Sequence, residues 1–524
     1  MSPMSAAAKT TIPGAMTPSQ VGRAVPCAPS PSQAASPHIR GAQGPARPTS
    51  PFIGTGSTSS VFGPHAPSVA LPLRFMVTGM VALFTGVVLL VLRPDILATY
   101  HYNQYVSAAT HLFVLGWICT IVMGAMYQLV PVALETRLYS EKLAAWQFVF
   151  HLVGFTGMVW MFWTWNMKQV GHFGSVLTVG VGLFVYNITR TLLRVPRWNV
   201  IATAVAAALG WLSLAVFAGL TVAVGKCSYE SSSAVAPGNP FGMLLHGLKS
   251  VAAFTARFDQ IAAMHAHAHL GAVGVFVMLI VGISYKLVPM FTLSDIQSRR
   301  RALASVALLN AGLLGVFVTI LLRHPLKFAC ALVVIAGLAC YGLEMIAILR
   351  ARKRRPLDWG LKSFLTAISL LAPLCVLALI LSWPGLPLTT LTGRLENLYG
   401  FLALAGVVSF AIIGMFYKII PFLVWYGSYS TQIGLRKVPS LADLYSPGLQ
   451  AAGYWTYVAG LVAATIAILL GNTVAVTCAC ALLALSLATL ALNVAKILSH
   501  LVGPRTEPLN LRPASLPSLR ATPQ

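Results

Sequence analysis

Residues 269–289 read HLGAVGVFVMLIVGISYKLVP, and the chain contains this pattern twice more. Residues 111–131 read HLFVLGWICTIVMGAMYQLVP, and residues 401–421 read FLALAGVVSFAIIGMFYKIIP. The three segments align without a gap and share a leucine, two glycines, a tyrosine and the final proline: Leu112, Leu270, Leu402, Gly116, Gly274, Gly406, Gly124, Gly282, Gly414, Tyr127, Tyr285, Tyr417, Pro131, Pro289 and Pro421. Such self-similarity predicts three copies of one structural unit.

Each copy lies in an apolar segment long enough to cross a membrane. Of the 524 residues, 57% are apolar and 9% are charged, against about 25% charged in soluble domains, which excludes a soluble globular enzyme. Continuous apolar runs of about 20 residues predict helices rather than the shorter, alternating strands of a barrel. The twelve predicted spans are about 71–92, 106–134, 142–165, 172–193, 200–224, 260–291, 302–322, 327–349, 360–384, 396–424, 451–470 and 474–499.

The repeats occupy the second, sixth and tenth spans, so the period is four helices. We therefore predict an all-α polytopic membrane protein with about 12 transmembrane helices in three pseudo-symmetric four-helix units, at about 69–193, 200–349 and 360–500. The paired glycines allow a neighbouring helix, or a flat cofactor, to approach closely. The tyrosines at the inner end suit a membrane interface. Residues 1–68 lack Asp and Glu and are rich in Pro, Ser and Ala, which predicts a disordered basic tail.

The basic residues indicate how the helices are oriented. The chain has 35 Lys and Arg against 11 Asp and Glu, a formal charge of +24, and most basic residues fall in loops on one side. Under the positive-inside rule that side is cytoplasmic. We expect an integral protein of a bacterial inner (cytoplasmic) membrane with both termini, including the 501–524 tail, in the cytoplasm, contacting lipid and not nucleic acid. An organelle transit peptide within the tail is the alternative for the N-terminus.

Histidines gather at the outer ends of the repeat helices, at His101, His111, His265, His267 and His269. Ionisable residues inside a membrane usually serve a function. His111 and His269 occupy the same repeat position, so they lie at the same depth and can hold one metal from two sides. The third copy has Phe401 there.

Helix geometry separates the roles of the H-A-H-A-H motif. At about 100° per residue, His267 and His269 point in opposite directions and can serve two cofactors that flank the helix. His265 shares a face with His269, where it can hydrogen-bond a cofactor propionate or a second ligand near the outer surface. His101 is expected at the outer mouth, and His151 is expected to be a packed or hydrogen-bonded residue within the third span.

The segments H-A-H-L-G-A-V-G-V and G-I-S-Y-K-L-V-P resemble the H-x-H helix of subunit I of the haem–copper oxidase and nitric oxide reductase superfamily, in its cbb-type or nitric-oxide-reductase-like branch. The resemblance implies twelve core spans in three arcs, and a low-spin b-type haem (heme b) with His111 and His269 as iron ligands. It implies His267 as the proximal ligand of a second, high-spin haem. A respiratory oxidoreductase of this kind takes electrons from a donor protein or quinol and binds or reduces a diatomic gas, O2 or NO.

The chain also departs from that family. The H-x-H lies on the sixth span here and on the tenth in the family, and the sequence has neither H-P-x-x-Y nor His-His. A copper site of the usual kind is therefore not expected, and the chain is interpreted as a divergent member. Two other functions stay open: a transporter of metal or haem, and a non-catalytic haem-based gas sensor. The concentration of histidines at one level disfavours a transport path.

Two further groups of polar residues suggest specific roles. Glu344, a carboxylate within a span, is either a proton relay or the ion-pair partner of the basic residues 350–355; we favour the ion pair. Arg257 and Arg394 lie at the outer level, where they can bind haem propionates. Six cysteines lie in apolar runs and are expected to pack as small hydrophobic residues: Cys119, Cys330, Cys340, Cys375, Cys478 and Cys480.

Overall fold

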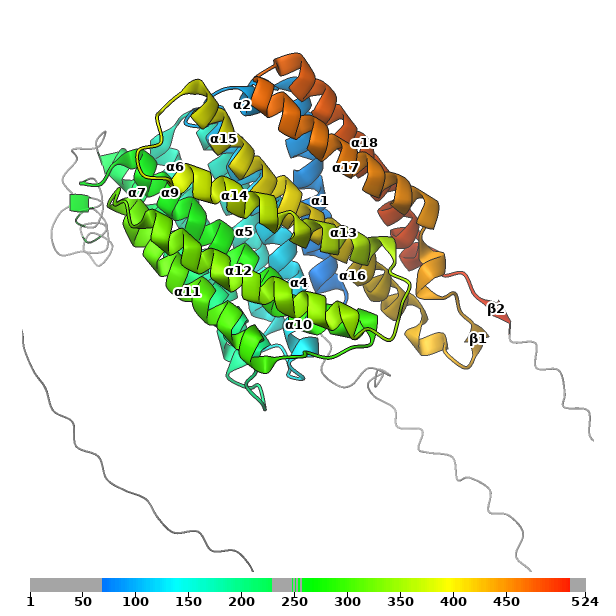
Figure 1. The fold of residues 1–524 in the computed structure, drawn as a ribbon. Coiled ribbons are helices and arrows are strands. Elements are labelled where there is room, and N and C mark those ends of the chain that lie inside the picture. The colour runs from blue at the N-terminus through cyan, green and yellow to red at the C-terminus, as the bar shows by residue number, and fades with distance from the viewer. Residues whose placement is uncertain (1–67, 229–246, 248–249, 251–252, 255–256, 509–524) are drawn as a thin grey trace, which may run out of the picture. The chain divides into compact units, whose positions relative to one another are not determined.

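The computed structural model describes residues 68–228, 247, 250, 253–254 and 257–508. Within them, twelve helices are long and apolar enough to cross a membrane, and each overlaps one of the predicted spans. The protein is an all-α polytopic membrane protein, as predicted (Figure 1). The predicted tail at 1–68 falls almost wholly outside the described residues, and so does most of the C-terminal tail.

Most spans are single helices, and the three that carry the repeat are composite. The single helices are α1 (Ala70–Leu92), α5 (Glu141–Trp163), α6 (Met167–Leu192), α7 (Val200–Ser228), α11 (Arg299–Leu321), α12 (Lys327–Arg350), α17 (Pro447–Leu470) and α18 (Thr473–Val502), while the ninth span consists of α13 (Trp359–Ser369) and α14 (Leu371–Ser382). The second span consists of α3 (Gln104–His111), η1 (Leu112–Cys119) and α4 (Thr120–Ala133), the sixth of α9 (Gln260–His269), η2 (Leu270–Val277) and α10 (Met278–Thr292), and the tenth of α15 (Thr390–Phe401), η3 (Leu402–Ser409) and α16 (Phe410–Tyr429). The shorter elements are α2 (Asp95–Ala98), η4 (Ser430–Gln432), η5 (Leu441–Leu444) and the antiparallel strands β1 (Arg436–Lys437) and β2 (Glu507–Pro508).

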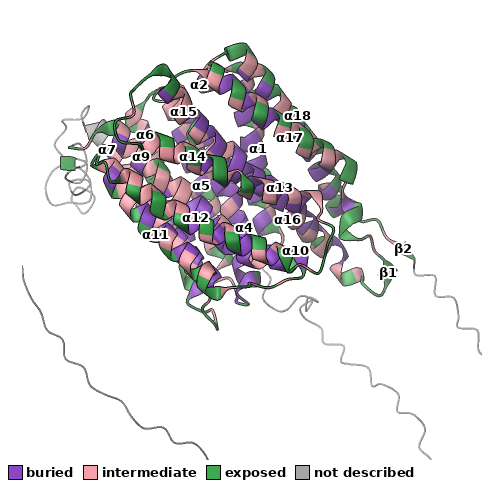
Figure 2. Ribbon diagram, in the orientation of Figure 1, coloured by how far each residue is buried: buried purple, intermediate pink, exposed green. Residues whose placement is uncertain are grey.

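The same packing scheme recurs in each four-helix unit. The first helix packs on the repeat helix, as α1 does on η1 and α4, α7 on η2 and α10, and α13 on α16. The third and fourth helices pack on each other, as α5 does on α6, α11 on α12 and α17 on α18. The repeat helices are the most buried of the twelve, with 56%, 67% and 78% of their apolar windows inside the protein. They form the centre of the bundle, and exposed positions mark the outward faces of helices such as α17 and α18 (Figure 2).

All three repeat helices change to π-helix at the same place. The π segments η1, η2 and η3 begin one residue after His111, His269 and Phe401 and are each eight residues long. The pattern of burial also agrees between copies: the second to fourth residues of each segment are partly buried and the last four are buried. π-Helical turns often occur at functional sites, because they leave backbone carbonyls available and redirect side chains.

The glycines of the repeat are contact points for the first helix of the same unit. A Cβ added at Gly282 would overlap Ala204 of α7, and one at Gly414 would overlap Gly360 of α13. A Cβ at Gly274 would lie 2.7 Å from Cβ of Trp211. The sequence predicted that these glycines admit either a neighbouring helix or a flat cofactor. In the described residues they admit a neighbouring helix.

The repeat tyrosines are buried within the bundle. Tyr127 is fully buried, and Tyr285 and Tyr417 are nearly so. Each hydroxyl has a polar partner on another helix of its unit: Gln147 at 3.3 Å, Ser305 at 2.9 Å and Asn493 at 3.3 Å, for Tyr127, Tyr285 and Tyr417 respectively. These bonds satisfy polar groups that lipid cannot, and they join the helices of each unit.

A second repeated feature ties the fourth helix of each unit to the start of the third. Each third helix begins at a serine cap, and a polar side chain of the fourth helix accepts a hydrogen bond from the amide of that serine. The pairs are Ser140 with Asn187 (3.1 Å), Ser298 with Glu344 (2.8 Å) and Ser446 with Asn493 (2.8 Å). The equivalence of two asparagines and one glutamate indicates a structural role for all three.

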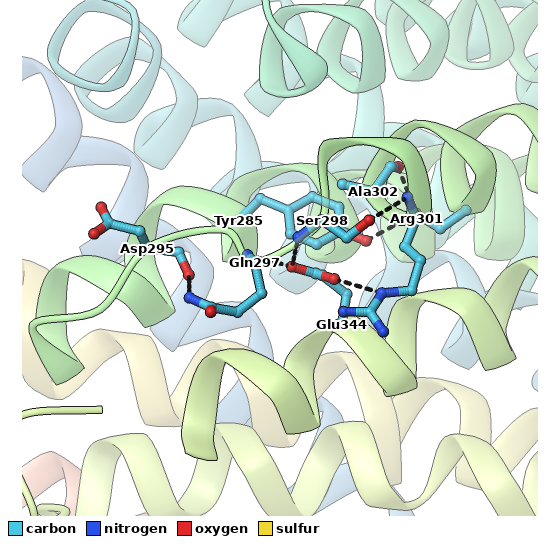
Figure 3. Close-up of polar contacts among 8 residues, drawn as sticks. Tyr285, Asp295, Gln297, Ser298, Arg301, Ala302 and Glu344 are labelled. Atoms are coloured by element: carbon cyan, nitrogen blue, oxygen red, sulfur yellow. Dashed lines mark hydrogen bonds and ion pairs between the residues drawn. The ribbon is translucent and has the colours of Figure 1, made fainter. Parts of the chain in front are cut away.

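Glu344 makes the most extensive version of this contact (Figure 3). Its Oε1 accepts from the amides of Gln297 (2.6 Å) and Ser298 (2.8 Å), and its Oε2 accepts from Nε of Arg301 at 2.9 Å. The carboxylate is fully buried. The expected ion pair is present, but its partner is Arg301 at the start of α11 instead of the 350–355 cluster. Since three polar contacts fix the carboxylate to one helix start, we assign it to the fold and not to a proton path.

Glu344→Ala should destabilise the bundle. It leaves two buried backbone amides without their acceptor and removes the ion-pair partner of the partly exposed Arg301 side chain, which costs about 2 kcal/mol or more in free energy of unfolding. Glu344→Gln keeps an acceptor for the amides and should cost less, and Asn187→Ala is the matched change in the first unit. Thermal unfolding in detergent measures the three losses. An unfolding temperature of Glu344→Ala equal to that of the wild type would contradict the structural role.

Candidate functional site

The five predicted histidines lie at one end of the bundle, which we call the histidine side. His101 lies between α2 and α3, His111 ends α3, and His265, His267 and His269 lie in α9. All five are partly buried. The five histidines therefore lie at the same end of the bundle, as the sequence predicted. Their side chains contact different partners.

His111 and His269 have the same local geometry. Nδ1 of His111 lies 2.7 Å from the carbonyl oxygen of Ser107, and Nδ1 of His269 lies 2.7 Å from that of His265. In each case the ring is held by the carbonyl four residues earlier, so the proton is assigned to Nδ1 and the lone pair to Nε2. A donating Nδ1 is the arrangement that orients metal-binding histidines in proteins.

The surroundings of the two Nε2 atoms differ. The His111 ring stacks on Phe162 at the end of α5, with ring centroids 4.5 Å apart. The His269 ring faces Tyr399 of α15, whose hydroxyl lies 3.4 Å from Nε2. His269 is therefore turned towards the third unit of the bundle.

His267 points in another direction from the same helix, as the spacing predicted. Its ring packs on α7, where a Cβ added at Gly219 would lie 2.9 Å from Cε1 of His267. Its Nδ1 is buried without a hydrogen bond to the described residues, and its ring interacts with the backbone of Ala215 on α7. His267 is also within electrostatic range of His111. It therefore lies between the first and second units.

His265 contacts His101. The two Nε2 atoms are 3.0 Å apart, and Nδ1 of His101 lies 3.7 Å from Oε2 of Glu396 on α15. Burial lowers the pKa of His101 below its usual value, although the neighbouring amide of Asn397 acts in the opposite sense. Sequence reasoning missed Glu396, Asn397 and Tyr399, whose only signal was their place just before the third repeat.

His151 is a structural residue, as expected. Its Nε2 lies 3.1 Å from the carbonyl oxygen of Leu115, to which Thr120 also donates at 2.8 Å. Leu115 belongs to η1, so these bonds satisfy a carbonyl within a π-helical turn. His500, to which the sequence assigned nothing, is buried, with Nδ1 2.6 Å from the hydroxyl of Tyr429.

The two arginines expected near propionates have partners within the chain. Arg394 donates to the carbonyl of Leu469 at 3.0 Å and packs on Gly471, so it caps the end of α17. Arg257 lies over the ring of Phe254. The six cysteines named above are free thiols.

Within the described part of the chain, no group of three or more His, Cys, Asp or Glu side chains is arranged to hold a metal ion. Comparison with protein-family models and with curated proteins finds no match for this sequence. The chemistry of the histidine side therefore has to be argued from its own residues.

His151→Ala should lower stability without disturbing the histidine side. The change removes a donor to the Leu115 carbonyl and leaves a cavity, for about 1–3 kcal/mol of unfolding free energy. His172→Ala is the control, because that side chain is exposed and, in the described part of the chain, bonds to Gln169 of the same helix. Thermal unfolding in detergent compares them, and equal unfolding temperatures for the two variants would contradict the role given to His151.

Proposed function

We propose that this protein is a haem-binding membrane protein that transfers electrons, as its resemblance to subunit I of haem–copper oxidases and nitric oxide reductases implies. The observation that carries the proposal is the matched pair of histidines, His111 and His269. Each has its Nδ1 fixed by a carbonyl at 2.7 Å and is followed by a π-helical turn. Both residues stand at the same position of the repeat and keep Nε2 available for a metal, as two histidines that bind haem iron would.

The surroundings of His267 also fit a flat iron-binding group. Its Nδ1 is buried and lacks a partner in the described residues. Gly271 lies one helical turn further on the same face, and a Cβ added there would meet no atom within 4 Å. A small residue with open space beside a buried imidazole allows a planar ring system to lie against the helix.

The geometry favours one assignment of the two ligand roles. Of the two histidines on α9 that could bind haem iron, His267 is the one that interacts electrostatically with His111, whereas His269 faces Tyr399 of the third unit. We therefore propose His111 and His267 for the low-spin haem and His269 for the second haem.

Other residues of the chain would position the haem ligands and contact a bound gas. A bound haem supplies an iron that accepts and releases one electron and can bind a diatomic gas at an open position. His111 is oriented by Ser107 and by stacking on Phe162, which would fix the ligand plane. The hydroxyl of Tyr399 lies beside Nε2 of His269, the proposed ligand of the second haem. There it could donate a hydrogen bond to a bound ligand or exchange a proton with it.

We also propose the orientation and membrane that the charges indicate. Basic residues gather at the ends of the helices opposite the histidine side, at Arg190, at 299–301 and at 350–355. By the positive-inside rule these ends face the cytoplasm, so the haems would lie towards the outer face. The bacterial inner membrane, and a donor protein or quinol as electron source, follow from the resemblance.

Visible spectroscopy of the purified protein tests the first part of this proposal. We expect the reduced-minus-oxidised spectrum of a low-spin b-type haem, which His111→Ala and His267→Ala each abolish by removing an axial ligand. The His151→Ala variant is less stable but keeps all the proposed haem ligands, so its folded fraction should show the wild-type spectrum. A folded wild-type protein that is colourless, and whose addition to haem leaves the haem spectrum unchanged, would contradict haem binding and favour transport.

Gas binding tests the second part. Carbon monoxide added to the reduced protein should shift a high-spin signal, and His269→Ala should remove that shift while leaving the low-spin bands. The opposite pattern, in which His269→Ala removes the low-spin bands and His267→Ala the gas-induced shift, would restore the roles that the resemblance alone implies. Turnover of O2 or NO would separate an oxidoreductase from a gas sensor.

A further inference from the structure

The contact between His101 and His265 has the dimensions of a metal site. The two residues are 164 positions apart and belong to different units of the bundle, yet their Nε2 atoms lie 3.0 Å apart. The rings are tilted by 32° with centroids 5.2 Å apart, so they meet at their nitrogen edges and do not stack. Zinc binds imidazole nitrogen at about 2.0–2.1 Å with tetrahedral angles, which places two such nitrogens about 3.3 Å apart. A shift of a few tenths of an ångström would admit the ion.

The other nitrogen of His101 lies near two acceptors of the kind that orient metal-bound histidines. Nδ1 is buried without a hydrogen bond in the described residues and lies 3.7 Å from the Glu396 carboxylate. Oδ1 of the neighbouring Asn397 is likewise buried without a hydrogen bond among them, while its Nδ2 donates to the carbonyl of Leu97. Both residues belong to α15. They offer acceptors to Nδ1–H, which would fix His101 with its Nε2 lone pair directed at His265.

We propose that His101 and His265 bind one divalent transition-metal ion through their Nε2 atoms, with Glu396 and Asn397 positioning His101. Imidazole nitrogen suits zinc, copper and nickel, whereas calcium and magnesium require oxygen ligands. Water would complete the coordination, since the protein supplies two ligands. Each unit of the bundle contributes one part: His101 from the first, His265 from the second and α15 from the third.

The charges near the pair are compatible with a cation. Glu396 lies beside His101, and Asp259, which caps α9, favours a positive charge at His265, whereas Lys327 opposes one. Arg323 pairs with Asp259 at 3.6 Å and partly offsets its charge. His101 and Glu396 keep 17% and 25% of their side chains exposed, so an ion can reach the site from the histidine side.

This site is separate from the proposed haem ligands but close to one of them. The carbonyl of His265 accepts the hydrogen bond from Nδ1 of His269. Replacing the His265 side chain leaves that carbonyl in place. The metal-site proposal can therefore be tested independently of the haem proposal, because it uses neither His111 nor His267.

Zinc titration of the full-length protein in detergent, in competition with a chromophoric chelator, tests the proposal. We expect one Zn²⁺ per chain, and a loss of this binding event in His101→Ala and in His265→Ala. Glu396→Gln, which removes an orienting carboxylate, should weaken binding by about 10–100-fold. His172→Ala removes an exposed histidine at the same end of the bundle and should bind zinc as the wild type does.

Two further measurements keep the outcome clear. The conservative variants His101→Gln and His265→Gln, checked for folding by thermal unfolding, should lose the site as the alanine variants do. The haem spectrum of His101→Ala should be unchanged, so its loss of zinc cannot be attributed to loss of haem. The proposal is overturned if the wild type binds no zinc, or if folded His101 and His265 variants bind it as tightly as the wild type.

Discussion

A polar group inside a membrane has no water to bond with, so each one must find its partner within the protein, and this requirement shapes the bundle. The repeated helix starts show it most directly. Ser140, Ser298 and Ser446 each open a third helix, and in each unit a polar side chain of the fourth helix receives the serine amide. The apolar faces leave the helices free to slide, since lipid is as apolar as leucine. The polar bonds fix their relative positions.

The same requirement explains how the histidines can be held at one level. A π-helical turn leaves carbonyls in need of donors, and the bundle supplies them: His151 and Thr120 meet the carbonyl of Leu115. The turns begin directly after His111 and His269, so the histidines are the last residues of regular α-helix before the helical register changes. The level of the imidazoles is thus set by the repeat itself.

The sequence predicted the twelve spans, the period of four helices and the end of the bundle at which the histidines gather, because length, apolarity and repetition act at the level of whole helices. It could not predict side-chain partners across units. The partner of Glu344 was expected in the 350–355 cluster, nearby in sequence, but Arg301 on the adjacent helix is closer in space. The π-helical turns were also missed, since the only residues common to their three sequences are a leucine and a glycine that suit an α-helix equally well.

The third copy of the repeat explains why the histidine side is not threefold. Three equivalent histidines around a central axis would converge on one point, and Phe401 removes that option. The third helix contributes partners instead: Tyr399 faces His269, and Glu396 lies beside His101. The contacts of the histidines therefore lie between pairs of helices and not on a common axis. Because each of these contacts involves a different pair of units, the proposed sites on α9 would have different neighbours, which a symmetric arrangement could not provide.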